Sequence, residues 1–170
     1  RELMQKSIII YSSVDGHTKE ICEKIAGHMI GDSDIFSVDD NPEIQNYEKI
    51  IIGASIRYGK YRTKLFDFIE SNIEVISEKE NAFFSVNVVA RKAEKNTPNT
   101  NPYVQKFLNS TTWIPNKVEV FAGKIDYPKY KFLDKYAIKF IMLITKGPTD
   151  TSKRYEFTDW DKVKNFAKNI

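Results

Sequence analysis

Hydroxyl groups and a glycine gather where the first apolar run of the sequence, Ser7–Ile10, comes to an end. The residues concerned are Ser12, Ser13, Gly16 and Thr18. Hydroxyls and backbone N–H groups at the positive N-terminus of a helix suit a phosphate monoester, and a glycine lets the chain turn tightly beside it. The alternative is an ordinary helix cap, with Ser13 or Asp15 as the N-cap and nothing bound.

Two other phosphate-binding motifs are missing from the sequence. The pattern G-x-x-x-x-G-K-[ST] does not occur, so the lysine and hydroxyl of a nucleoside-triphosphate loop are lacking. The dinucleotide pattern G-x-G-x-x-G does not occur either, because Gly16 is the only glycine of the loop. These absences leave a single phosphate group as the anion that best suits the loop.

Two further loops would meet this one if their strands belong to the same parallel sheet. Tyr58 and Tyr61 flank Gly59 after the apolar run Lys49–Ile56, and Ser85–Lys92 follows a third such run. A tyrosine beside a glycine offers a flat, apolar wall for a ring system, and the backbone of the third loop can bind the polar edge of that ring. A phosphate together with a stacked ring predicts flavin mononucleotide, FMN.

The spacing of apolar residues predicts the elements that position these loops. Buried strands are expected at Ser7–Ile10, Lys49–Ile56, Asn81–Val89 and Lys117–Gly123, with a weaker one at Ser33–Val38. Helices are expected from Thr18, over Leu65–Ile76, at Tyr103–Asn109, from about Lys129 to Gly147, and from about Thr158. Alternating strands and helices indicate one α/β domain over 1–170, a flavodoxin-like three-layer sandwich. Its five-stranded parallel sheet has the order 2-1-3-4-5, with the ligand at the carboxyl ends of the strands.

Several segments carry a resemblance to a known family. The first loop, "YSSVDGHT", resembles the phosphate loop of flavodoxins, although Asp15 replaces the middle threonine of their usual S/T-x-T-G-x-T pattern. The segments "IIGASIRYGKY", "FFSVNVVARKAEKNTPNTNPY", "FAGKIDYPKYKFLDKYAIKFIM" and "YEFTDWDKVKNFA" together resemble the flavodoxin-type, quinone-dependent protoporphyrinogen IX oxidases of bacteria. This resemblance extends from Ser7 to the C-terminus.

The resemblance implies an FMN-dependent dehydrogenation of protoporphyrinogen IX to protoporphyrin IX in haem biosynthesis. Electrons would pass to a membrane quinone, menaquinone or ubiquinone. The phosphate group would contact Ser12, Ser13, Val14, Asp15, Gly16, His17 and Thr18. The ring would lie against Ser55, Ile56, Arg57, Tyr58, Gly59 and Tyr61, and its edge against Ser85, Val86, Asn87, Val88, Val89 and Ala90. Either Tyr58 or Tyr61 would stack on the ring. Because the flavin performs the redox chemistry, no acid–base triad is expected.

The two propionates of the implied substrate require cationic partners. Arg57, Arg91 and Lys92 lie near the predicted flavin, and arginine suits bidentate binding of a carboxylate. The alternative for each is a solvated loop, where charged residues are usually found. The stretch Lys95–Tyr103 is either a lid over the flavin or only a long connection.

Positive charge is concentrated in one segment of the chain. The net charge is +3, but residues 124–146 contain six lysines and two aspartates, which leaves −1 on the remainder. Within Tyr127–Leu143, lysines alternate with aromatic and aliphatic residues, a composition typical of a helix on an anionic membrane surface. Lys139 interrupts the apolar run far short of the ~20 residues that would span a bilayer.

The alternative is an ordinary helix of the sandwich, in which the core is faced by Ile138, Ile141 and Ile144. The excess of apolar residues on more than one face favours a membrane or partner surface. We expect a cytoplasmic protein that associates peripherally with the cytoplasmic face of the inner membrane. The single cysteine, Cys22, excludes an internal disulfide and is expected in the core of the first helix.

Other classes of function receive less support from the sequence. No cluster of ligating residues has the spacing of a metal site, and no basic and aromatic platform for nucleic acid occurs outside residues 124–146. Three rivals remain: a flavodoxin-like electron carrier, an FMN-dependent NAD(P)H:quinone reductase, and a non-catalytic binding module. Electron carriers of this type are usually acidic around the flavin, whereas this chain has basic residues there, Arg57, Arg91 and Lys92.

Overall fold

A central parallel β-sheet organises the chain. The computed structural model describes residues 6–13 and 16–170. Its strands are β1 (Lys6–Ser12), β2 (Asp32–Ser37), β3 (Lys49–Ser55), β4 (Glu80–Val86) and β5 (Lys117–Phe121). They pair in parallel in the order β2-β1-β3-β4-β5. The predicted order is therefore confirmed.

Uninterrupted apolar runs form the middle of this sheet because both of its faces are covered. Ile9 of β1 pairs with Ile51 of β3, which in turn pairs with Ala82 of β4. All three residues are buried. Strand β2 lies at the edge, and its side chains are partly or fully exposed, which explains its weaker apolar pattern.

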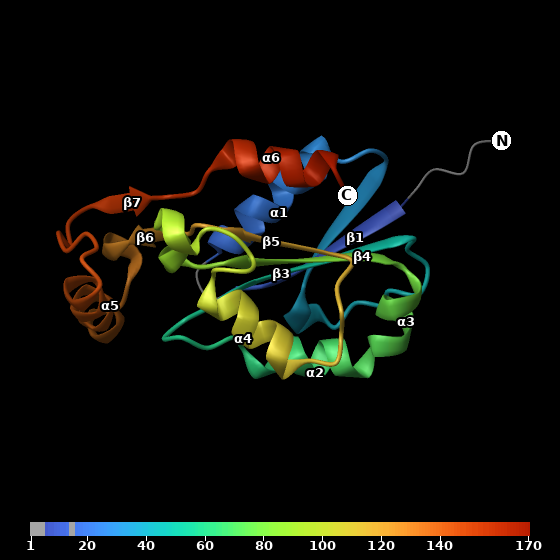
Figure 1. Cartoon of the computed structure of the whole chain (residues 1–170), viewed down its shortest axis with the longest axis horizontal. Coiled ribbons are helices and arrows are strands. Elements are labelled where there is room, and N and C mark those ends of the chain that lie inside the picture. The colour runs from blue at the N-terminus through green and yellow to red at the C-terminus, as the bar shows by residue number, and fades with distance from the viewer. Residues whose placement is uncertain (1–5, 14–15) are drawn as a thin grey trace.

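Helices cover both faces of the sheet and give the predicted three layers (Figure 1). Helices α1 (His17–His28) and α6 (Trp160–Lys168) pack against Ile9, Ile51 and Phe84. Helices α2 (Thr63–Ser71), α3 (Ile73–Glu78) and α4 (Pro102–Ser110) pack against Ile8, Ile52 and Phe83. Successive strand residues point to opposite faces, so each strand contributes to both cores. Cys22 of α1 is fully buried, as expected.

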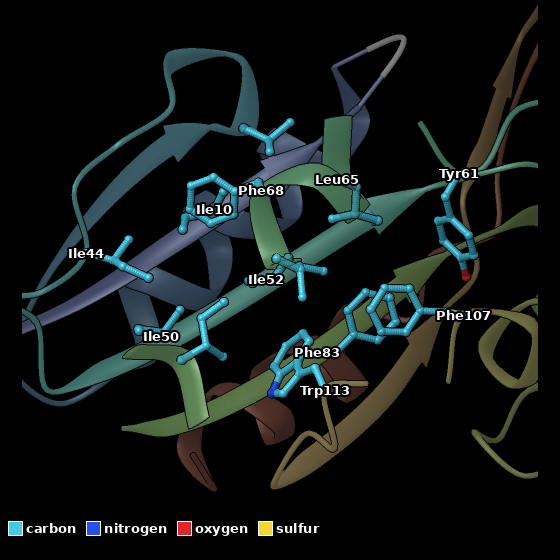
Figure 2. Packing of buried hydrophobic residues seen from close by; sticks show 14 of the residues in the cluster. Ile10, Ile44, Ile50, Ile52, Tyr61, Leu65, Phe68, Phe83, Phe107 and Trp113 are labelled. Atoms are coloured by element: carbon cyan, nitrogen blue, oxygen red, sulfur yellow. The ribbon is translucent and has the colours of Figure 1, made fainter. Parts of the chain in front are cut away.

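An aromatic cluster fills the core beneath α2 and α4 (Figure 2). The rings of Phe83 and Phe107 stack with centroids 3.7 Å apart, and Trp113 meets both rings edge-on. Tyr61 lies at one end of this cluster and contacts the Phe107 ring edge-on. This packing fixes the position at which the chain leaves β3 and enters α2.

Three local features differ from the expected elements. The single helix expected over Leu65–Ile76 is divided into α2 and α3, because Asn72 leaves helical geometry and donates from its amide to the Phe68 carbonyl. The polar stretch after β4 contains two short 3₁₀ turns, Val88–Arg91 and Ala93–Lys95. A small antiparallel pair of strands, β6 (Lys124–Asp126) and β7 (Arg154–Glu156), was not expected.

Helix α5 (Phe132–Ile144) lies at one end of the molecule beside β6 and β7 (Figure 1). It begins later than expected because a 3₁₀ turn, Tyr127–Lys129, precedes it. Met142 is buried with Ile125 and Tyr127 in a small separate core, against which Ile138 also packs. Within residues 6–13 and 16–170, no helix combines the length and apolar character needed to cross a bilayer.

Candidate functional site

A cavity of about 410 Å³ opens beside the carboxyl ends of β3 and β4 and the start of α1. It brings together the start of α1 and the loops after β3 and β4, whereas Ser12, Ser13 and Gly16 are not among the described residues that line it. Its lining comprises His17, Thr18, Ser55, Ile56, Arg57, Tyr58, Gly59, Val86, Asn87, Val88, Val89, Tyr103, Gly123, Lys124, Ile125, Tyr130, Ile138, Ile141 and Met142.

The first loop presents the N-terminus of α1 to one end of this cavity. Gly16 occupies the N-cap position with φ +87°, a left-handed conformation that favours glycine. Its backbone N–H donates to Ser13 Oγ at 2.9 Å, so the Ser13 hydroxyl closes the turn instead of capping the helix. Val14 and Asp15, also expected here, lie outside the described residues.

Two hydroxyl groups beside this helix start are buried and unsatisfied. Ser12 Oγ and Thr18 Oγ1 have no hydrogen-bond partner among the described residues. A buried polar atom without a partner costs about 1–3 kcal/mol. Thr18 lines the cavity, so its hydroxyl and the N–H groups of the helix N-terminus suit a bound anion, whereas Ser12 is not among the described residues that line it.

His17 connects this helix start to Thr158, just before α6, and through it to the segment that follows β5. The Thr158 hydroxyl donates to the Ala122 carbonyl at 2.8 Å, so it accepts from His17 Nε2–H, also at 2.8 Å. Nδ1 lies 3.3 Å from Glu20 Oε2. Burial and the nearby Lys124 ammonium lower the pKa of His17, and Glu20 opposes this shift only in part. His17 thus directs Nε2 to Thr158 and not to an anion at the loop.

The turn after β3 places one tyrosine at the cavity and the other in the core. Tyr58 and Gly59 take left-handed conformations, φ +52° and +76°, and Tyr58 lines the cavity. Tyr61 is only 8 % exposed, and its hydroxyl bonds Ser85 Oγ at 2.8 Å and the Tyr103 carbonyl at 2.9 Å. Burial raises the pKa of Tyr61. Of the two candidates for stacking on a ring, only Tyr58 faces the cavity.

The end of β4 and the loop after it contribute four consecutive residues to the cavity wall. Val86, Asn87, Val88 and Val89 line it, whereas Ser85 and Ala90 are buried away from it. The Asn87 side chain accepts from the Ala90 N–H and also bonds the buried Asn101 amide. This network ties down the stretch Lys95–Tyr103, of which only Tyr103 reaches the cavity.

The three predicted cations have different surroundings. Arg57 lines the cavity and lies 3.5 Å from Asp134 of α5. Arg91 donates to the Val88 and Thr145 carbonyls, and burial lowers the pKa of its guanidinium. It therefore joins the loop after β4 to the end of α5. Neither Arg91 nor the partly exposed Lys92 is among the residues that line the cavity in the described part of the chain.

Comparison with known proteins agrees with this arrangement. The flavodoxin domain family matches residues 8–152. The chain is 41% identical over 170 residues to a protein of Escherichia coli (strain K12) named protoporphyrinogen IX dehydrogenase [quinone], covering 97% of this chain and 94% of that protein. The chain belongs to the flavodoxin family of these dehydrogenases.

A second member of this family gives the same degree of similarity. A protein of the same name from Leishmania major is 41% identical over 171 residues, covering 97% of this chain and 74% of that protein. Among solved structures, oxidised flavodoxin 1 from Bacillus cereus aligns with a TM-score of 0.52 and 17% identity, over 96% of this chain and 95% of that one. At that identity the structural match shows the flavodoxin fold alone.

This flavodoxin-family cavity includes residues that the sequence reasoning did not assign to it. They are Tyr103, Gly123, Lys124, Ile125, Tyr130, Ile138, Ile141 and Met142. The spacing of Ile138, Ile141 and Met142 is that of one helical face, which was the available signal. Part of α5 therefore faces the cavity. The alternative, in which Ile138, Ile141 and Ile144 face the core of an ordinary sandwich helix, is wrong for Ile141 and Ile144, which are both exposed.

Proposed function

We propose that this chain binds FMN and dehydrogenates protoporphyrinogen IX to protoporphyrin IX in haem biosynthesis, with a quinone as electron acceptor. The observation that carries this function is the 41% identity, over nearly the whole chain, to proteins named protoporphyrinogen IX dehydrogenase [quinone]. The cavity supports it, because the start of α1 and the loops after β3 and β4, which would bind the flavin, meet there.

The residues at the start of α1 fit the phosphate of FMN. Thr18 Oγ1 is a buried hydroxyl without a partner in the described chain and belongs to a residue that lines the cavity, and a phosphate oxygen would satisfy it. Gly16 has no Cβ, and apart from its chain neighbours no atom of the described residues lies within 4 Å of where one would be, which suits an anion at the helix N-terminus. Buried hydroxyls in folded proteins normally have a partner, and a bound phosphate is the partner that we propose for Thr18.

The wall of the cavity fits the ring of FMN and a porphyrinogen. Tyr58 offers an aromatic face, and the backbone of Val88 and Val89 can bind the polar edge of the ring. Ile138 and Ile141 supply apolar contact for a macrocycle. Bound FMN supplies the two-electron redox chemistry; the protein excludes water and orients the substrate.

The exposed face of α5 suits contact with a membrane that holds the quinone. Phe132, Leu133, Phe140, Leu143 and Ile144 are all exposed there. Lysines lie beside them at positions 129, 131, 135 and 139, and each contributes on the order of 1 kcal/mol at an anionic surface. We propose peripheral attachment through α5 to the cytoplasmic face of the inner membrane, where the leaflet is anionic.

Anaerobic turnover tests the proposed reaction. Holoprotein with bound FMN is mixed with protoporphyrinogen IX and a menaquinone or ubiquinone analogue, and porphyrin fluorescence is followed. We expect quinone-dependent formation of porphyrin well above a control with FMN alone. A second reaction replaces the porphyrinogen with NADH. No acceleration over free FMN would contradict the proposal, and quinone reduction by NADH alone would favour the reductase alternative.

A further inference from the structure

Asp134 of α5 lies against two residues of the cavity rim. Its Oδ2 is 3.5 Å from Arg57 Nη1, and the Tyr58 hydroxyl donates a short hydrogen bond to its Oδ1. Both partners line the cavity. A carboxylate from the distal helix therefore meets a guanidinium and a phenol hydroxyl at the opening of the proposed flavin and substrate site.

A guanidinium beside a hydroxyl donor is a carboxylate-binding arrangement. The Tyr58 hydroxyl is protonated and is a donor at physiological pH, because the ordinary pKa of tyrosine is about 10; the hydrogen bond to Asp134 raises that pKa further. The Arg57 side chain is held in place by the ring of Tyr130, whose centroid lies 5.4 Å from Cζ. The two donors thus do not depend on Asp134 alone for their position.

The ion pair between Arg57 and Asp134 is weak enough for a ligand carboxylate to replace Asp134. The side chain of Asp134 is 36 % exposed and that of Arg57 19 % exposed, and ion pairs open to solvent contribute little net stability. A ligand carboxylate with the same chemistry can therefore replace Asp134 without leaving a buried charge uncompensated. A fully buried pair would not exchange in this way.

We infer that Arg57 and Tyr58 form a carboxylate-binding subsite at the cavity rim, and that Asp134 occupies it in place of a carboxylate of the ligand. The inference rests on the proposed function, in which the substrate has two propionates. When one propionate binds Arg57 and Tyr58, Asp134 is displaced and α5 loses this contact with the rim.

The alternative role for Asp134 is to position Arg57 and Tyr58 for the ligand. The two roles predict opposite results for Asp134→Asn, which keeps the shape of the side chain and removes its charge. If Asp134 competes with the ligand, the variant binds a dicarboxylate more tightly. If Asp134 positions the two donors, the variant binds it more weakly.

Equilibrium binding of two porphyrins to the FMN-loaded protein separates these roles. Mesoporphyrin IX has two free propionates, whereas its dimethyl ester has none. In Asp134→Asn we expect mesoporphyrin IX to bind about threefold to fivefold more tightly, the effect of one partly exposed ion pair, with the ester unchanged. Asp67→Asn, a substitution of an exposed aspartate on α2, removes the same charge and should change neither affinity.

A double-mutant cycle with Arg57→Gln tests whether the effect passes through Arg57. In the Arg57→Gln background, Asp134→Asn should no longer change the affinity for mesoporphyrin IX. Unchanged or weaker diacid binding in Asp134→Asn, or an equal gain for the ester, would overturn the inference while leaving the proposed function intact. No binding of mesoporphyrin IX by the wild-type holoprotein would count against both.

Discussion

Ser12 and Thr18 each bury a hydroxyl group that has no hydrogen-bond partner in the described chain. Buried polar groups are nearly always satisfied in folded proteins, so such atoms mark a place where a partner belongs. Thr18 lies in the first turn of α1, which Gly16 precedes as the N-cap residue, and it lines the cavity. At the scale of single residues, these unsatisfied hydroxyls favour an anion site over an ordinary helix cap.

Replacing Thr18 by valine tests this reading directly. Valine keeps the shape of the side chain and removes a hydroxyl that the apoprotein leaves unsatisfied, so the free energy of unfolding of the apoprotein should stay the same or rise. FMN affinity, measured by quenching of flavin fluorescence, should fall by about 1 kcal/mol, the usual contribution of one hydrogen bond. Unchanged FMN affinity would argue against a phosphate contact at Thr18.

Thr158→Val is the matched control for this substitution. Its hydroxyl donates to the Ala122 carbonyl and accepts from His17, so its removal leaves bonded groups without a partner. We expect the apoprotein to lose about 1–3 kcal/mol of unfolding free energy. The contrast between the two threonines distinguishes a hydroxyl that bonds only a ligand from one that stabilises the folded protein.

His17 predicts a dependence of stability on pH. Its pKa in the folded protein is lowered by burial and by Lys124, so below the ordinary value of about 6.5 the unfolded chain binds more protons than the folded one. The stability associated with neutral His17 is therefore full above pH 6.5 and is lost as the pH falls through the lowered folded-state value.

Urea unfolding between pH 5 and pH 8 measures this effect. The loss of unfolding free energy below pH 6.5 should be smaller in His17→Gln than in the wild type. His28→Gln is the comparison: slight desolvation and nearby lysines also lower the pKa of His28, but this residue is partly exposed at the end of α1, so its substitution should change the profile less than His17→Gln. A pH profile unchanged by His17→Gln would show that His17 does not cause the loss of unfolding free energy at low pH.

At the scale of elements, the sequence was sufficient to predict the strands that consist of uninterrupted apolar runs. Strands β1, β3 and β4 follow from such runs, and the sheet order follows from their alternation with helices. Strands β6 and β7 could not be predicted, because three residues each are too few for any periodicity. The break at Asn72 depends on one side-chain hydrogen bond, which the apolar stripe across it does not reveal.

The candidate site could likewise be predicted only in part from the sequence. The loops at the strand ends could be located, since they depend on topology alone. The burial of Tyr61 could not, because it depends on contacts with Phe107 and Ser85 from distant segments. The contact of Asp134 with Arg57 also joins distant parts of the chain, and only the folded structure reveals it.

Packing between β3 and β4 predicts a severe effect of a small substitution. A Cβ at Gly53 would overlap the ring of Phe84, so Gly53→Ala should lower the free energy of unfolding by about 1–3 kcal/mol or more. Gly27→Ala is the control: the site on α1 is open, and alanine there should stabilise by roughly 0.5–1 kcal/mol. Equal effects in denaturant unfolding would contradict this account of the sheet.

At the scale of the whole molecule, α5 belongs to two surfaces. Ile138, Ile141 and Met142 line the cavity, while Phe140 and Leu143 are 63 % and 60 % exposed on the same helix. A membrane contact through the exposed face would therefore place the opening of the cavity near the lipid. A quinone with a long apolar tail could then reach the site without crossing water.

Replacing Phe140 and Leu143 together by glutamate tests this arrangement. Each apolar side chain contributes about 1.5–3 kcal/mol when fully buried, and added negative charge repels anionic lipid, so binding to anionic vesicles should fall more than tenfold. Turnover with a long-tailed quinone in those vesicles should fall with it, while turnover with a short, water-soluble quinone stays near the wild-type rate. Ile114→Glu, at a residue 86 % exposed elsewhere, should change neither rate. Equal losses with both quinones would mean that α5 acts through the cavity and not through the membrane.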